Sequence, residues 1–301
     1  RRNGFLPPAP PDATEVFVSP TIVPKSVDWR LHGLVNDIKN QQQCGSCWAF
    51  SAIASLEGQF AKHHNLTSFS EQDLVDCVKN VDSRVGLCCD GCEGGLMSAA
   101  FDYIVSSQNG GDDLENKYSY DAIDENCRWA TSGPSLGRVV GQRNLPQGSH
   151  AALEQAVATV GPISVGVDAN DDWQMYQSGV YVPDPETGCS SDPSMLDHGV
   201  AVVGYNTDTF NNSTMSYWII RNSWGTDWGI DGYMYLSKDV HNACGLANFA
   251  SYPVLSEVSE NQCLNSHPQC PSEVCYTPCP CACFVASSTS PCDCSAATCS
   301  C

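Results

Sequence analysis

The sequence has no apolar run long enough to cross a membrane. A spanning helix needs about 20 consecutive apolar residues, and no run in these 301 residues approaches that length. Basic residues are scarce as well: the chain has 14 Lys and Arg but 34 Asp and Glu, which gives a formal net charge of -20. Such a charge repels nucleic acid and anionic membrane surfaces. We therefore expect no membrane span and no nucleic-acid partner.

Cysteine, in contrast, is abundant. The chain has 19 cysteines, and a reducing cytosol would leave them as thiols or metal ligands, so disulfides formed in an oxidising compartment are the first interpretation. Because 19 is an odd number, at least one thiol stays free, pairs with another molecule or binds something. N-glycosylation sequons at residues 65–67 and in the overlapping pair that begins at Asn211 and Asn212 are compatible with the same compartment.

Composition divides the chain into three parts. Residues 1–22 are rich in proline and have no clear period, which predicts an extended segment outside a core. Residues 23–255 carry helical and strand patterns. Residues 256–301 hold ten of the cysteines and no Lys or Arg. This tail has too few large apolar residues for a core and needs crosslinks or metal. Its even set of ten cysteines favours five internal disulfides, with bound metal as the alternative.

The main part changes character near its middle. Apolar residues at helical spacing predict helices at 47–60, 96–105 and 151–160, and Ser70 has the form of a helix cap. Short runs rich in β-branched and aromatic residues predict strands at 163–167, 199–205, 217–220 and 232–236. Helices followed by strands indicate an α+β chain of two lobes, with a cleft between them as the place for a site.

One cysteine stands at a position that favours reactivity. Cys47 falls in the first turn of the helix predicted at 47–60. Unpaired amides and the helix dipole favour an anion there, so the pKa of this thiol is expected to fall. The alternative is that Cys47 is half of a disulfide. A reactive thiolate also needs a proton partner and a group that orients that partner.

Two further motifs supply these groups. His198 opens one predicted strand and Asn222 follows another, within the stretch 217–225. With the stretch 41–51, which reads Gln-Gln-Gln-Cys-Gly-Ser-Cys-Trp-Ala-Phe-Ser, these motifs resemble those of the papain-like cysteine peptidases, most closely the cathepsin L-type members. Residues 26–30, 91–95 and 244–246 match as well, and the resemblance covers about residues 1–255. It implies the papain-like α+β fold: a helical N-terminal lobe, an antiparallel β-barrel-like C-terminal lobe and an active-site cleft between them.

The resemblance also implies the roles of single residues. Cys47 corresponds to the nucleophile, His198 to its imidazole partner and Asn222 to the amide that holds the imidazole ring. Gln41 corresponds to the oxyanion donor, together with the backbone N–H of Cys47. The substrate-binding residues implied are Gly45, Gly94, Gly95, Leu96, Met97, Gly166, Leu196, Asp197, Trp224 and Phe249. Five of these, Leu96, Met97, Gly166, Leu196 and Phe249, imply an apolar pocket for the second substrate residue upstream of the cut.

Family pairing implies the disulfides Cys44–Cys92, Cys77–Cys127 and Cys189–Cys244. Cys88 and Cys89 lie in an apparent insertion, and they form either a vicinal pair or part of a rearranged pairing. Gln42 is another departure, because the family usually has Gly there. It leaves open the local backbone shape beside the oxyanion hole, but not the donor itself.

These observations favour a cysteine endopeptidase that needs no cofactor and no metal. A catalytically silent homologue that binds or carries a partner is one alternative, and a protein whose main functional part is the cysteine-rich tail is another. The expected partners are polypeptide substrates and protein inhibitors of the cystatin type, and the chain is expected to be a monomer. Residues 1–22 resemble the end of a family propeptide, an inhibitor of its own enzyme, and without the helical part this remnant is expected to inhibit weakly. We expect a lysosome, an equivalent acidic vacuole or the extracellular space as the location.

Overall fold

The structure is a computed structural model, and it describes residues 4–5, 23–83, 86–129, 138–210 and 213–256. The predicted cysteine-rich tail lies outside the described residues except for Ser256. Of the predicted propeptide remnant, only Gly4 and Phe5 are described. Within the described parts, no helix combines the length and the apolar character that a membrane span requires.

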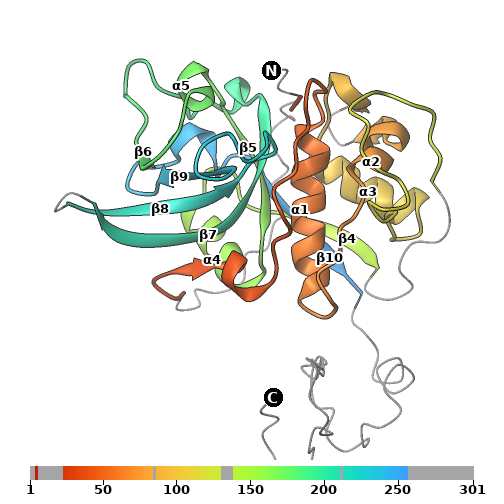
Figure 1. Cartoon of the computed structure of the whole chain (residues 1–301), viewed down its shortest axis with the longest axis horizontal. Coiled ribbons are helices and arrows are strands. Elements are labelled where there is room, and N and C mark those ends of the chain that lie inside the picture. Colours follow the sequence, from red (N-terminus) through yellow and green to blue (C-terminus); the bar gives the residue numbers. More distant parts are fainter. Residues whose placement is uncertain (1–3, 6–22, 84–85, 130–137, 211–212, 257–301) are drawn as a thin grey trace, which may run out of the picture.

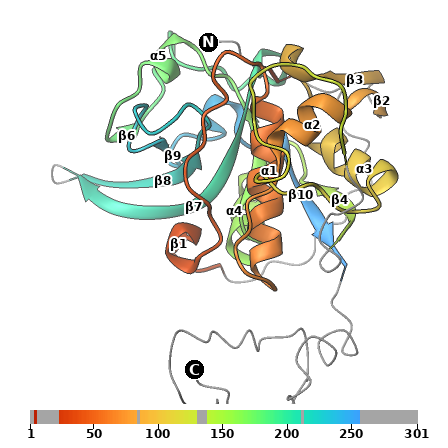
Figure 2. The ribbon, with the colours of Figure 1, turned by 45° about the vertical axis from the view of Figure 1, so that its right-hand side comes forward.

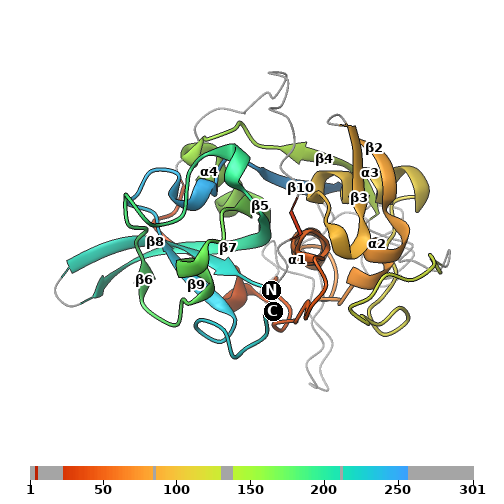
Figure 3. The same ribbon diagram turned by 90° about the horizontal axis from the view of Figure 1, so that it is seen from above.

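A long central helix separates the two halves of the molecule. α1 (Cys47–Ala61) has 13 of its 15 residues buried, because the helical lobe covers one side of it and the sheet covers the other (Figure 1). In the view along its axis, α1 lies between these two parts (Figure 3). The apolar spacing predicted this helix, and its nearly complete burial reflects contact with both lobes.

The helical lobe contains two further helices and a short hairpin. α2 (Glu71–Cys77) begins at Ser70, whose side chain accepts a hydrogen bond from the Asp73 N–H at 2.9 Å. α3 (Met97–Ser107) packs against α1. The hairpin consists of β2 (Lys79–Ser83) and β3 (Gly86–Asp90), and a 3-10 turn at Gly91–Glu93 follows it. Aromatic side chains such as Trp48, Phe69 and Phe101 form the core of this lobe.

The second lobe is built on one strongly bent sheet. Its strand order is β4-β10-β5-β7-β8-β9-β6, with β1 paired to β7, and all pairs except β6 with β9 are antiparallel. β10 contacts α1 and β4 contacts α3, so these two strands connect the sheet to the helical lobe (Figure 2). The strands are β1 (Val27–Asp28), β4 (Val139–Asn144), β5 (Ile163–Val167), β6 (Val180–Tyr181), β7 (His198–Phe210), β8 (Ser213–Arg221), β9 (Tyr233–Ser237) and β10 (Ala250–Leu255).

Shorter elements complete this lobe. α4 (His150–Thr159) begins at Ser149, whose hydroxyl accepts a hydrogen bond from the Ala152 N–H, and α5 (Asp171–Gln174) begins at Asn170. Single 3-10 turns lie at Trp29–His32, Pro193–Met195 and Ala243–Gly245. Trp173 and Trp218 are among the fully buried side chains of the core.

The predicted α+β class and the two lobes are confirmed. β5 has the predicted bounds, whereas β7 and β8 continue well beyond the predicted 199–205 and 217–220. Their outer parts pair with each other away from the core, and residues such as Thr207, Asp208 and Thr209 are exposed and polar. The sequence predicted only the buried half of the β7–β8 hairpin, because the apolar pattern used to predict strands is present only where a strand is buried.

Candidate active site

The only described cysteine outside a disulfide is Cys47. It is the first residue of α1 and is fully buried where that helix meets the beginning of β7. The backbone N–H of Gly199 donates a hydrogen bond to its Sγ at 3.2 Å. The tertiary fold thus brings the thiol beside His198, which is 151 residues further along the chain.

The expectation of a lowered thiol pKa is wrong for this form of the chain. Burial raises the pKa of Cys47 to about 11, and the N–H groups of Gly199 and Gly4 oppose this effect only in part. A helix terminus favours a thiolate, but removal of water disfavours any charge, and here the loss of water has the larger effect.

His198 and Asn222 form a direct pair. The imidazole Nε2 lies 2.8 Å from Asn222 Oδ1, and the N–H of Ser223 donates to the same oxygen at 2.8 Å. That second bond fixes which amide atom faces the ring, because a backbone N–H requires an acceptor. The indole of Trp224 stacks on the imidazole at a centroid distance of 4.6 Å. Antiparallel pairing of β7 with β8 places the start of one strand beside the end of the other.

Gln41 reaches this pair through Ser223. The Gln41 N–H donates to the Ser223 carbonyl at 2.8 Å, and the Ser223 hydroxyl donates to Gln41 Oε1 at 2.7 Å. The amide Nε2 donates to the Cys44 carbonyl at 2.9 Å, which directs it toward the segment that enters α1. The next residue, Gln42, has a φ of 54°, in the left-handed region that favours glycine.

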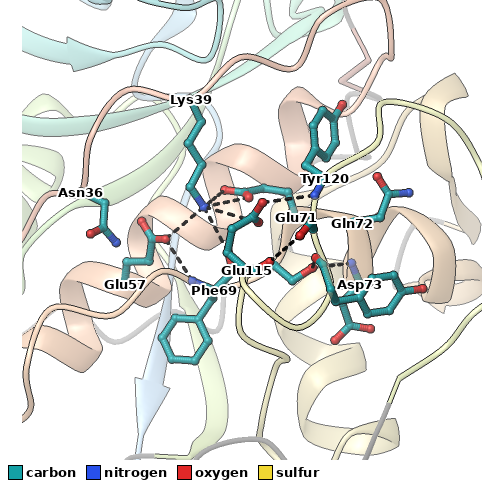
Figure 4. A network of polar contacts seen from close by, with 12 residues as sticks. Asn36, Lys39, Glu57, Phe69, Glu71, Gln72, Asp73, Glu115 and Tyr120 are labelled. Atoms are coloured by element: carbon teal, nitrogen blue, oxygen red, sulfur yellow. Dashed lines mark hydrogen bonds and ion pairs between the residues drawn. The ribbon is translucent and has the colours of Figure 1, made fainter.

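A buried ion network anchors the segment that carries Gln41 (Figure 4). Lys39 Nζ donates to both carboxylate oxygens of Glu71 at 2.8 Å and to Glu57 at 3.3 Å. Burial alone would lower the pKa of Lys39, but the charges of Glu71 and Glu57 raise it above its ordinary value. The Lys39 carbonyl in turn accepts from the Gly225 N–H at 3.1 Å. The segment is therefore held by the helical lobe on one side and by the sheet lobe on the other.

Two N-terminal residues lie between the two lobes. Phe5 is only 5% exposed, and it forms a parallel bridge with Gly95. The Gly95 N–H donates to the Gly4 carbonyl at 2.8 Å, and the Phe5 N–H donates to the Asp197 carbonyl at 3.0 Å. The expectation that residues 1–22 lie outside a core is therefore wrong for these two residues. No sequence pattern distinguishes Phe5, because residues 1–22 also contain Leu6 and Phe17.

Phe5 lies among the residues expected to form the apolar pocket. Its ring lies 5.9 Å from that of Phe249, and a Cβ at Gly166 would lie only 2.7 Å from the Phe5 Cζ. Three further members of the predicted pocket belong to the same buried apolar cluster as Phe5: Leu96, Met97 and Leu196. These distances thus place Gly166 and Phe249 at the Phe5 ring, and the other three residues lie in the same apolar core. Glycine at position 166 is what leaves room for the ring.

The bound segment has a defined direction. Gly4 packs on the backbone of Gly45 and directs its N–H to Cys47, and the following residue, Phe5, enters the pocket. The segment therefore runs from the thiol at Gly4 toward the pocket at Phe5.

Four disulfides join described cysteines. Cys44–Cys92 links the entrance of α1 to the segment of Gly94 and Gly95, and Cys77–Cys127 and Cys189–Cys244 lie in the helical and sheet lobes. Of the two alternatives for the insertion, the structure has the vicinal pair Cys88–Cys89. One group of potential metal ligands in the described chain joins Asp73 to Cys77 and Cys127. Both of its sulfur atoms are in a disulfide, so it does not offer a metal a set of ligands.

Comparison with known proteins agrees with this geometry. Residues 23–254 match the family described as "Papain family cysteine protease". The chain is 47% identical to human cathepsin L2 over 79% of this chain and 69% of the relative, and 47% identical to digestive cysteine proteinase 3 of Homarus americanus over 76% and 66%. These alignments span about two thirds of the relatives' length.

A solved structure shares the fold as well. The digestive procathepsin L 3 of the Tenebrio molitor larval midgut superposes with a TM-score of 0.69 and 38% identity, over 84% of this chain and 76% of that chain. The chain therefore belongs to the papain family of cysteine proteases and is cathepsin L-like.

Proposed function

We propose that this protein is a cysteine endopeptidase in which Cys47 is the nucleophile and His198 its proton partner. The observation that supports this most strongly is the buried thiol of Cys47 at the beginning of α1, next to an imidazole whose Nε2 is held by Asn222. Since Nε2 is engaged in that bond, Nδ1 is the ring nitrogen that exchanges a proton with the thiol. Trp224 covers the pair and excludes water from it.

The reaction follows from these positions. The thiolate attacks the peptide carbonyl, and the oxyanion that develops is met by Gln41 Nε2 and the N–H of Cys47. The imidazolium of His198 protonates the leaving amine, which departs and leaves a thioester on Cys47. Water then attacks the thioester, and His198 takes the proton of that water. Asn222 keeps the ring oriented through both steps.

The nucleophile is tested by substitution. Cys47→Ser should abolish peptide hydrolysis while the circular dichroism spectrum stays unchanged, and Asn222→Ala should leave a reduced rate because the amide orients the base without taking a proton. Titration of the Phe5→Ala chain, in which the thiol is uncovered, with an epoxysuccinyl peptide should count one reactive thiol per chain. Wild-type turnover by Cys47→Ser would exclude this mechanism, and no reactive thiol would favour a silent homologue used for binding.

The substrate-binding groups are those that Gly4 and Phe5 use. A substrate of the opposite direction would pair with the Gly95 N–H and the Asp197 carbonyl as a short added strand. Its second residue upstream of the cut would enter the pocket of Leu96, Met97, Gly166, Leu196 and Phe249. None of these side chains pairs with a charge, so Leu or Val gains about 1.5–3 kcal/mol from burial whereas Arg loses solvation.

This specificity is measured on fluorogenic peptides that vary only at that residue. Leu and Val should exceed Arg in kcat/KM, and Phe249→Ala should widen acceptance toward Phe and Tyr. Arg equal to Leu would contradict the pocket described above.

The wider setting is proposed on the same basis. The domain limits are a propeptide remnant at 1–22, a peptidase domain at 23–255 and a cysteine-rich tail at 256–301. Deletion of the tail should spare the hydrolysis of small peptides, because every proposed catalytic residue precedes it. We place the monomeric enzyme in a lysosome or equivalent acidic vacuole, or outside the cell, with polypeptide substrates, its own propeptide and cystatin-type inhibitors as partners. Its relatives include digestive enzymes and procathepsins.

A further inference from the structure

A small cavity lies between the lobes, directly beside the Asn222–His198 pair. Its volume is about 10 Å³, close to the space that one water molecule occupies. α1 contributes one wall and the beginning of β7 another, and the third consists of the end of β8 and the turn that follows it. The side chain of Lys39 also lines the cavity. The lining residues on which the inference depends are Ser51, Ala54, Val200, Arg221 and Asn222.

Two buried donors in this wall have no acceptor among the residues that the structure describes. These are Arg221 Nε and Asn222 Nδ2, in side chains that are 6% and 3% exposed. The other groups of both residues are engaged. Arg221 donates through Nη2 to the Asp37 carbonyl at 2.6 Å, and Asn222 Oδ1 serves His198 and Ser223. A buried N–H without a partner costs about 1–3 kcal/mol, and native proteins satisfy nearly all such groups.

We propose that this cavity binds one water molecule, which accepts hydrogen bonds from Arg221 Nε and Asn222 Nδ2 and so makes Arg221 a positioning residue for the Asn222–His198 pair. Water fits the site because it has two lone pairs for two donors. Its hydrogens remain for acceptors in the cavity wall, such as the hydroxyl oxygen of Ser51.

The consequence is control of the orientation of the Asn222 amide. If this amide rotated by half a turn, it would present its NH₂ group to His198 and weaken the support of the imidazolium. The Ser223 N–H opposes that rotation at Oδ1, and the water would oppose it at Nδ2. Arg221 holds the water, and Glu57 and Asp37 hold Arg221. The inference rests on the proposed roles of His198 and Asn222, but the water itself can be tested without them.

The direct test is a high-resolution crystal structure of the full chain. It should show a water within hydrogen-bond distance of Arg221 Nε and Asn222 Nδ2, and an empty cavity would overturn the proposal. Crystals soaked in bromide distinguish a halide from water, since an anomalous peak in the cavity would assign an anion and reject water. Neither result depends on activity. An empty cavity would therefore reject the water alone, whereas the proposed catalytic roles would be rejected if Cys47→Ser still hydrolysed peptides.

The functional test uses Arg221→Met. We expect kcat to fall about tenfold, the effect of one lost hydrogen bond, with KM unchanged. The alkaline limb of the pH profile should move to lower pH, because the imidazolium loses support. Arg221→Lys, which keeps a charged donor, should restore most of the rate, and the exposed Arg143→Met should behave as wild type. A folded Arg221→Met variant with an unchanged pH profile would show that Arg221 acts only in stability.

Discussion

Substitution of Phe5 tests whether the N-terminal segment blocks the cleft. In the structure its ring fills the apolar pocket between Gly166 and Phe249 and is 5% exposed. Burial of a phenylalanine side chain contributes about 1.5–3 kcal/mol, which corresponds to roughly 10- to 150-fold in the equilibrium between covered and open cleft. Phe5→Ala should raise the open fraction by a factor in this range. This expectation replaces the weak inhibition inferred from the sequence, which took residues 1–22 to lie outside a core.

The assay is alkylation of Cys47 by iodoacetamide, followed by mass spectrometry. The Phe5→Ala chain should react faster than wild type at equal pH, both because the thiol is uncovered and because its pKa, raised by burial in the covered form, falls when water returns. Since the segment is part of the same chain, the wild-type rate should not change on dilution. Leu31→Ala is the control, because Leu31 is 81% exposed. Equal alkylation rates for Phe5→Ala and wild type would refute the reasoning.

Three other substitutions test the surroundings of the site. Gln42→Gly should raise the free energy of unfolding in urea by about 1 kcal/mol, because it relieves a left-handed backbone at φ 54°, and a loss of stability would contradict this. Ser223→Ala should lower kcat/KM about tenfold, because it removes the hydroxyl that orients Gln41, and an unchanged value would show that the amide needs no such support. Burial raises the pKa of Asp73 to about 6, beside the carboxyl of Asp112. The raised value means that protonated Asp73 stabilises the fold fully below about pH 4 and that this contribution is lost as pH rises through 6. Urea unfolding of Asp73→Asn between pH 4 and 7 should show a weaker decline than wild type, and an equal decline would contradict this account.

The sequence by itself determined the elements and the motifs. Helix α1 and strand β5 follow from local apolar spacing, and the cap at Ser70 follows from local hydrogen bonding. These features depend on near neighbours in the chain, so a linear pattern contains them. The motif around Cys47 likewise predicted the family, which the comparisons confirm.

Tertiary structure alone decided what surrounds each group. The pKa of Cys47 depends on how much water reaches it, and this thiol is fully buried at a place where the N–H groups of Gly4 and Gly199, from two distant parts of the chain, are directed to it. Gln41 is oriented by Ser223, which is 182 residues away, and Phe5 is buried only because a pocket from both lobes receives it. Burial and long-range hydrogen bonds are properties of the packed chain. No local pattern encodes them, because the residues that create them meet only after folding.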